Sequence, residues 1–250
     1  MNAEPREWVS CWADVYSSGY GTVATAFLEK VVEPSLTSID EQISHWESGF
    51  KPEHMFHADA ITTLRRATTS AFALSLQSLW ERQFRAYLRS CALNLPDAGP
   101  DAVARSEASL WTKLERLFID LRHVKVSDFE AWPVLELLNT VGNACRHGDG
   151  PSAKRLMVEK PEWWPQPRPG FPPPPENPGY TPHPPTFNNA TVPREVLRDF
   201  ADAIVLFWAE IKYHHDLPLF QKHNDPNIGA WLRKEDLARA ARQAKQEAAK

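Results

Sequence analysis

Residues 64–91, LRRATTSAFALSLQSLWERQFRAYLRSC, carry the strongest helical signal of the chain. No glycine or proline interrupts the sequence between Pro52 and Leu93, so one helix can run through all of it. Large apolar residues fall on more than one face of its later half, and such a helix must be covered on several sides. We therefore predict a multi-helix bundle built around a long central helix.

The segments on both sides of this helix also repeat apolar residues at spacings of three and four. Pro34 is expected to end the first of them, and Asp128 to cap the helix that leads into residues 135–147. No segment shows the alternation typical of a strand, so the predicted fold class is all-α. The other expected helices span residues 6–32, 35–46, 102–123, 128–147, 152–158, 192–214 and 234–250.

We divide the chain into three parts. Helices in 1–50 are expected to pack on a helical bundle in 51–215, and residues 216–250 form a C-terminal extension. The last helix has high helix propensity but few large apolar residues, which predicts a solvated tail. Gly19 and Gly21 are expected to kink or split the first helix, because glycine costs about 1 kcal/mol in a helix interior.

Residues 161–193 form a proline-rich irregular insertion that holds 13 of the 22 prolines. Proline lacks an N–H and fixes φ, so this stretch is expected to be extended or polyproline II. One interpretation is a ligand for an aromatic groove on a partner protein. The other is an excursion packed on the surface through its aromatic residues Trp163, Trp164, Phe171 and Tyr180.

Composition limits the compartment and the classes of site. The 250 residues carry a net charge of −4, which gives no overall electrostatic footprint for nucleic acid but allows a local basic groove. Cys11, Cys91 and Cys145 are far apart in sequence and predict buried thiols in a reducing compartment. The sequence shows no signal peptide and no run of about eighteen apolar residues. We expect a cytoplasmic protein with no membrane span, no metal and no cofactor.

The stretch 135–150, LELLNTVGNACRHGDG, holds the candidate site. An apolar helix ends there on Asn143, Arg146 and His147, and Gly148 is a natural terminator because glycine tolerates the left-handed conformation. Cationic residues in the last turn of a helix also meet the negative end of its dipole. A purely structural helix end therefore explains the same residues equally well.

This segment resembles the HEPN superfamily of helical domains. Its motif is an arginine, a polar residue that is often asparagine, three further residues and a histidine; Asn143 and His147 match, while Gly142 stands at the arginine position. The resemblance implies metal-independent RNA cleavage in active members. It also implies a homodimer, in toxin–antitoxin, abortive-infection or CRISPR-linked settings. Members that lack the arginine can equally be inactive binding or scaffold modules.

The resemblance implies a role for each candidate residue. His147 would act as acid and base, Arg146 would stabilise negative charge on phosphorus and Asn143 would orient the reacting groups. The backbone at Gly148 and Gly150 would approach a phosphate, joined by a set of arginines on the central helix. That set is Arg82, Arg85 and Arg89.

Two hypotheses follow for function. The first is a HEPN-like protein of bacterial defence that binds RNA, with endoribonuclease activity as a further possibility. The second is a non-catalytic helical scaffold or interaction protein. Its partner contact would be the proline-rich segment or the C-terminal helix. The exposure of His147 is the feature that distinguishes them.

Overall fold

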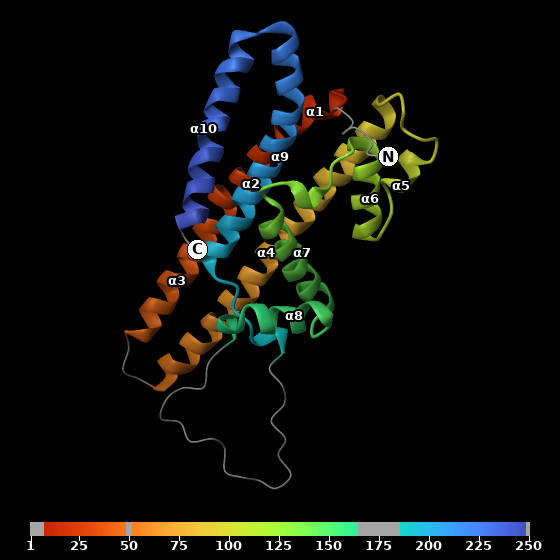
Figure 1. Cartoon of the computed structure of the whole chain (residues 1–250). Coiled ribbons are helices and arrows are strands. Elements are labelled where there is room, and N and C mark those ends of the chain that lie inside the picture. The colour runs from red at the N-terminus through yellow and green to blue at the C-terminus, as the bar shows by residue number, and fades with distance from the viewer. Residues whose placement is uncertain (1–7, 49–51, 165–185, 249–250) are drawn as a thin grey trace. The chain divides into compact units, whose positions relative to one another are not determined.

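The computed structural model describes residues 8–48, 52–164 and 186–248, and every regular element in these ranges is a helix (Figure 1). This confirms the predicted all-α class and the long central helix, α4. Within these ranges no helix combines the length and apolar composition that a membrane span requires. The helices are α1 (Trp12–Ser17), α2 (Tyr20–Phe27), α3 (Glu33–Glu47), α4 (Pro52–Asn94), α5 (Ala102–Arg105), α6 (Trp111–Arg122), α7 (Trp132–His147), α8 (Pro151–Glu159), α9 (Arg194–His223) and α10 (Pro226–Ala248).

The chain divides into two compact units, and α4 and α9 each contribute to both. The first unit comprises Met1–Thr22, Glu81–Trp132 and Val205–Lys250. The second comprises Val23–Trp80 and Pro133–Ile204. Each unit has its own buried apolar residues and is described separately.

An aromatic cluster forms the core of the first unit. The Phe84 ring of α4 is fully buried and lies 5.5 Å from Phe118 of α6 and 5.9 Å from Phe207 of α9. Trp208, also buried, donates its indole N–H to Gln83 Oε1 at 3.0 Å. Such aromatic pairs add to the stability already gained from apolar burial. The cluster therefore fixes the later half of α4 against α6 and α9.

The core of the second unit is mostly aliphatic and lies along α7, the first half of α4 and the start of α9. At its edge, Arg194 of α9 donates to Glu33 Oε2 at 2.7 Å, and Arg65 of α4 lies 2.8 Å from an oxygen of Asp40 of α3. Fully buried members are Ala73, Leu76, Leu135, Leu138, Val141, Leu197, Phe200 and Ile204.

The N-terminal helices differ from expectation at Pro34. The expected split at the glycines is confirmed, since α1 ends at Ser17 and α2 begins at Tyr20. Pro34, however, does not end the helix: a π-helical turn, Leu28–Val32, leads directly into α3. Proline clashes with the carbonyl four residues earlier. The wider π turn interrupts that spacing, so Pro34 lies in the first turn of α3, where its missing N–H is not needed.

Two helix boundaries in the first unit were also predicted wrongly. The helix expected at 102–123 is two helices, α5 and α6, because 106–110 contains no continuous apolar stripe and Leu110 has extended backbone. Asp128 does not cap α7. It closes a short 3₁₀ turn, Val126–Asp128, by accepting a bond from the Lys125 N–H at 3.2 Å, and α7 begins at Trp132.

The C-terminal region forms a helical hairpin rather than a solvated tail (Figure 1). α9 continues to His223, nine residues past its predicted end, and α10 begins at Pro226. Leu232 of α10 is 4% exposed. A Cβ on Gly229 would lie 2.5 Å from the Phe220 ring, so the helix backbone itself packs on that ring. This contact, near the connection between the helices, gives no periodic apolar stripe, and the sequence pattern therefore missed it.

The proline-rich insertion is described only at its ends. Trp163 and Trp164 are 3% and 5% exposed, which agrees with packing rather than free extension at this end. The Trp163 carbonyl accepts the Thr191 N–H at 2.7 Å, so the two ends of the insertion are held together. Phe171 and Tyr180 lie outside the described residues.

Candidate functional site

The candidate site lies at the C-terminal end of α7. Leu135, Leu138 and Val141 are fully buried and anchor one face of the helix. Asn143 and His147, four residues apart, share the opposite, exposed side. The structure thus places the sequence-predicted histidine at the surface of its unit, where a ligand can reach it.

The helix end follows the predicted glycine chemistry. Gly148 has φ +64°, and its N–H bonds to the Ala144 carbonyl at 2.9 Å, as in the αL type of helix end. Gly150 then precedes Pro151, the first residue of α8. Between them, Asp149 accepts a hydrogen bond from the Phe187 N–H at 2.6 Å. Among the described residues other than its chain neighbours, nothing lies within 4 Å of a Cβ placed on Gly148 or Gly150. The Gly150 N–H bonds to the Gly148 carbonyl at 2.8 Å, so this loop offers space to a ligand rather than free N–H donors from these two glycines.

Gly142 occupies the position of the family arginine and cannot be replaced by a larger residue without movement. It is buried, and a Cβ built there would lie 2.7 Å from Gln77 Cγ. Gln77 is itself only 3% exposed and donates to Asn139 Oδ1 at 3.3 Å. The helix backbone packs against Gln77, so this position has no room for a guanidinium that could reach His147.

Arg146 is held by α4. Its Nη2 donates to Gln77 Oε1 and lies 3.4 Å from Ser78 Oγ. The residue is nevertheless exposed overall. These contacts orient the guanidinium, and its five N–H donors allow it to bind a further acceptor alongside Gln77.

A pocket of about 530 Å³ lies in the same unit but does not contain His147. It includes Cys145, which is two positions from His147 and therefore points about 200° away on the helix. Its polar lining includes Arg66, whose Nε donates to Thr191 Oγ1 at 3.2 Å. The other lining residues are Thr63, Ala67, Ser70, Ala71, Leu74, Phe187 and Asn188. The imidazole is thus presented on a surface rather than in this pocket.

The three arginines predicted to join the site belong to the other unit. Arg85 binds Glu81 Oε1 through Nη2 at 2.7 Å and also donates to the Ala108 carbonyl. Arg89 pairs with Glu107 at 3.1 Å. Arg82 is exposed. Arg85 and Arg89 thus already have acidic partners within their own unit, and the role of these arginines at the site stays a prediction.

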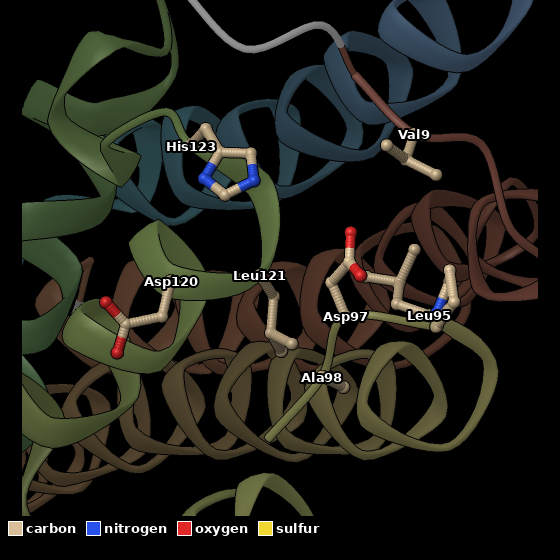
Figure 2. A pocket seen from close by; sticks show the side chains of 8 residues that line it. Val9, Leu95, Asp97, Ala98, Asp120, Leu121 and His123 are labelled. Atoms are coloured by element: carbon tan, nitrogen blue, oxygen red, sulfur yellow. The ribbon is translucent and has the colours of Figure 1, made fainter. Parts of the chain in front are cut away.

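A second pocket, of about 60 Å³, lies beside the end of α6 (Figure 2). Its wall includes His123, which ends the helix with φ +61°, and Asp97. Asp120 contributes to the same wall, but its carboxylate is 2.5 Å from Arg105 Nη2 and 3.2 Å from Arg116 Nε. Ligand pockets for small molecules usually measure about 300–1,000 Å³, so this one holds little more than water. Among the described residues, no cluster of His, Cys, Asp and Glu suits a metal ion.

Sequence reasoning missed a fully buried ion pair in the first unit. Asp14 and Arg122 have side chains that are 0% exposed, and Arg122 Nη2 lies 2.5 Å from Asp14 Oδ1. Asp14 also accepts bonds from the Tyr87 hydroxyl at 2.8 Å and the Cys11 N–H at 2.9 Å. Burial raises the pKa of Asp14, but contacts from His215, Arg122 and the other donors outweigh it, and the net pKa is lowered.

The sequence did contain a signal for this pair. Arg122 falls among the buried residues of α6, with Leu114, Phe118 and Leu121, where a charge is out of place. Charged residues are almost never fully buried unless they are paired. The partner, however, lies 108 residues away, and only the tertiary structure identifies it.

Comparison with protein-family models, with curated proteins and with solved structures finds no match to this chain.

Proposed function

We propose that this protein binds RNA through the exposed end of α7, as a HEPN-like helical protein in which phosphate binding is retained without strand cleavage. The observation that carries the proposal is the set of three exposed polar side chains within five residues: Asn143, Arg146 and His147. The contacts of Arg146 with Gln77 and Ser78 support it, because they orient the guanidinium before a ligand arrives.

Charges of both signs meet at this helix end, and Arg146 supplies the donors for an anion. The C-terminus of a helix carries about −0.5 of an elementary charge, which opposes a phosphate. Arg146 contributes a full positive charge and can present parallel N–H donors to phosphate oxygens. The loop through Gly148 and Gly150 then leads to the N-terminus of α8, where the helix dipole is positive. Asp149 in the same loop adds a negative charge, which accepts the Phe187 N–H, so the directed N–H donors of Arg146 rather than the net charge would hold a phosphate.

The arrangement does not favour cleavage. General acid–base cleavage of RNA needs a group that stabilises the charge on phosphorus beside the histidine. Gly142 leaves the family position for that group empty of side chain, and its packing on Gln77 prevents a substitute there. Arg146 is adjacent to His147 and therefore projects about 100° away from it around the helix. Binding is the activity that these residues support best.

In the interaction-protein alternative, α10 would offer a partner only its outer face. α10 packs on α9 through buried Leu232 and through Arg239, whose guanidinium lies 3.9 Å from the centre of the Tyr213 ring. This helix is therefore not a free arm. The other surface, the proline-rich segment, lies for the most part outside the described residues.

The test is binding of fluorescently labelled single-stranded RNA, followed by anisotropy at several salt concentrations. Replacement of Arg146 with alanine should weaken binding uniformly across sequences and lower the magnitude of the salt slope by about 1. Arg116→Ala is the matched control, because Arg116 is an arginine whose side chain is 72% exposed and which belongs to the other unit. A triple change at Asn143, Arg146 and His147 should abolish binding.

The same samples, incubated in chelator and run on a denaturing gel, distinguish binding from catalysis. Intact RNA with Arg146-dependent binding supports the proposal. RNA fragments that disappear in His147→Ala would show an endoribonuclease and overturn the non-cleaving part. Equal binding by wild type and the triple variant would overturn the site itself.

A further inference from the structure

Two cysteines that are 80 positions apart in sequence meet at the buried ion pair of the first unit. Arg122 Nη2 lies 3.1 Å from Cys11 Sγ and 3.2 Å from Cys91 Sγ. Both sulfur atoms therefore share one guanidinium nitrogen, which places the Cys91 thiol on the same side of Arg122 as a donor toward Cys11.

The two thiols differ in their environment. The hydrogen bond from Cys91 is the largest influence on Cys11; together with the Arg122 charge it outweighs burial and lowers the pKa of Cys11 to about 6. Burial raises the pKa of Cys91, which is 0% exposed. Cys11 is thus held as the thiolate and Cys91 as the thiol that donates to it.

Solvent reaches only the Cys11 side of this pair. Cys11 is partly exposed and lines a pocket of about 420 Å³. His215, whose Nδ1 lies 3.4 Å from Asp14 Oδ2, forms another part of the wall. The remaining lining residues are Ser10, Trp12, Val15 and Asn94. The pocket is open enough to admit a small molecule to the Cys11 sulfur.

We propose that Cys11 and Cys91 form a two-cysteine redox site, in which Cys11 is oxidised by a small hydroperoxide entering this pocket and Cys91 then closes an intramolecular disulfide. This site is independent of the RNA-binding surface on α7, which belongs to the other unit. Its parts are a partly exposed thiolate, a buried thiol in contact with it and a guanidinium that touches both.

The reaction balances with the hydroperoxide as the oxidant. The Cys11 thiolate attacks the terminal oxygen of ROOH; the O–O bond breaks, an S–O bond forms and the alkoxide or hydroxide takes up a proton to leave as ROH. The Cys91 sulfur then attacks the Cys11 sulfenic acid. An S–S bond forms, the S–O bond breaks, and the hydroxyl leaves as water with the Cys91 proton. Two thiols are oxidised and one hydroperoxide is reduced.

Cys145 provides an internal comparison, because burial raises its pKa to about 11. At neutral pH, Cys11 then carries about 10⁴-fold more thiolate. The intrinsic nucleophilicity of a thiolate falls as its pKa falls, with a Brønsted coefficient of about 0.4–0.5. The Cys11 thiolate is therefore intrinsically less reactive than the Cys145 thiolate by a factor of roughly 100–300. We expect Cys11 to react roughly 30- to 90-fold faster than Cys145. Both cysteines are partly exposed, so the comparison is between thiols of similar access.

The experiment treats the fully reduced protein with hydrogen peroxide and maps disulfides by peptide mass spectrometry. Wild type and Cys145→Ser should lose two thiols and form a Cys11–Cys91 peptide link that dithiothreitol reverses. Cys91→Ala should stop at a Cys11 sulfenic acid, which dimedone traps. Cys11→Ser should form neither product.

A second measurement uses only the wild-type protein and therefore does not depend on whether the variants fold. It compares the alkylation rates of two cysteines in the same chain. Iodoacetamide labelling of Cys11 and Cys145, quantified peptide by peptide against pH, should show Cys11 reacting faster with a midpoint near 6. Equal alkylation of the two cysteines, or peroxide treatment that leaves Cys11 and Cys91 reduced, would overturn the proposal. A disulfide between chains rather than within one chain would overturn the role of Cys91.

Discussion

Replacing Arg122 with methionine tests the ion pair between Arg122 and Asp14, which is fully buried in the first unit. Methionine keeps much of the side-chain volume but removes the charge next to Asp14, whose side chain is 0% exposed. The carboxylate would retain its bonds from Tyr87 and the Cys11 N–H, yet it would be a buried charge without a cation. Removing one partner of such a pair costs about 3–5 kcal/mol.

That loss is large enough to measure by several methods. For a chain of 150–250 residues, each kcal/mol lowers the melting temperature by about 2–4 °C, so Arg122→Met should lower it by roughly 6–20 °C. Arg116→Met is the control, since this exposed arginine pairs with Asp120 at 3.2 Å and its loss should change stability by no more than about 0.5 kcal/mol.

The stability contributed by Asp14 should depend on pH differently in the wild type and in Arg122→Met. In the wild type the pKa of Asp14 is lowered below 3.8, so its contribution is present above that pH and is lost as the pH falls through the folded value. Without Arg122, burial still raises the pKa of the carboxyl, while the contacts from His215, Tyr87 and the Cys11 N–H still lower it, so the pKa rises toward its unfolded value. Part of the stability that the wild-type carboxylate contributes above its folded pKa is then missing. The stability deficit of the variant should therefore be largest above pH 3.8 and shrink as the pH falls below that value.

Urea unfolding followed by circular dichroism measures these differences as midpoint shifts at an unchanged slope. Adding Asp14→Asn to Arg122→Met should recover part of the loss, because it removes the unpaired charge. A deficit below about 1 kcal/mol, or no recovery in the double variant, would refute the assignment of the ion pair as a buried, coupled unit.

Three further predictions concern helix ends and packing. Gly148→Ala should cost about 1–2 kcal/mol, because φ is +64° there, while Gly150→Ala, with φ −72°, should change the urea midpoint little. Gly142→Arg should lower the free energy of unfolding by at least the roughly 1–3 kcal/mol typical of overpacking and should not create RNA cleavage; cleavage by a folded variant would contradict the packing argument. Leu232→Ala should lower the free energy of unfolding by about 2–5 kcal/mol, whereas Leu237→Ala, at 74% exposure, should change it very little. Equal effects of the two changes would support the original prediction that α10 is a solvated tail.

Local pattern was a good guide wherever one residue's own preference decides the structure. The glycine-free stretch after Pro52 predicted α4 to within one residue of its end at Asn94. Gly148 ends α7 as its backbone freedom predicted. Local pattern failed where the neighbouring backbone compensates for a residue's preference. Pro34 was expected to end its helix, but the π turn before it accommodates the proline. The division of the chain at residues 51 and 216 stays a prediction.

The sequence by itself determined the all-α class, the central helix and the polar end of α7, because periodicity and helix-end chemistry act over a few residues. Tertiary structure alone decided that Gly142 packs on Gln77, 65 positions away, and that Asp14, Cys11 and Cys91 converge on Arg122. The physical reason is that a buried charge or thiol takes its properties from the groups around it. Those groups come from distant parts of the chain, and no local pattern records which of them will meet.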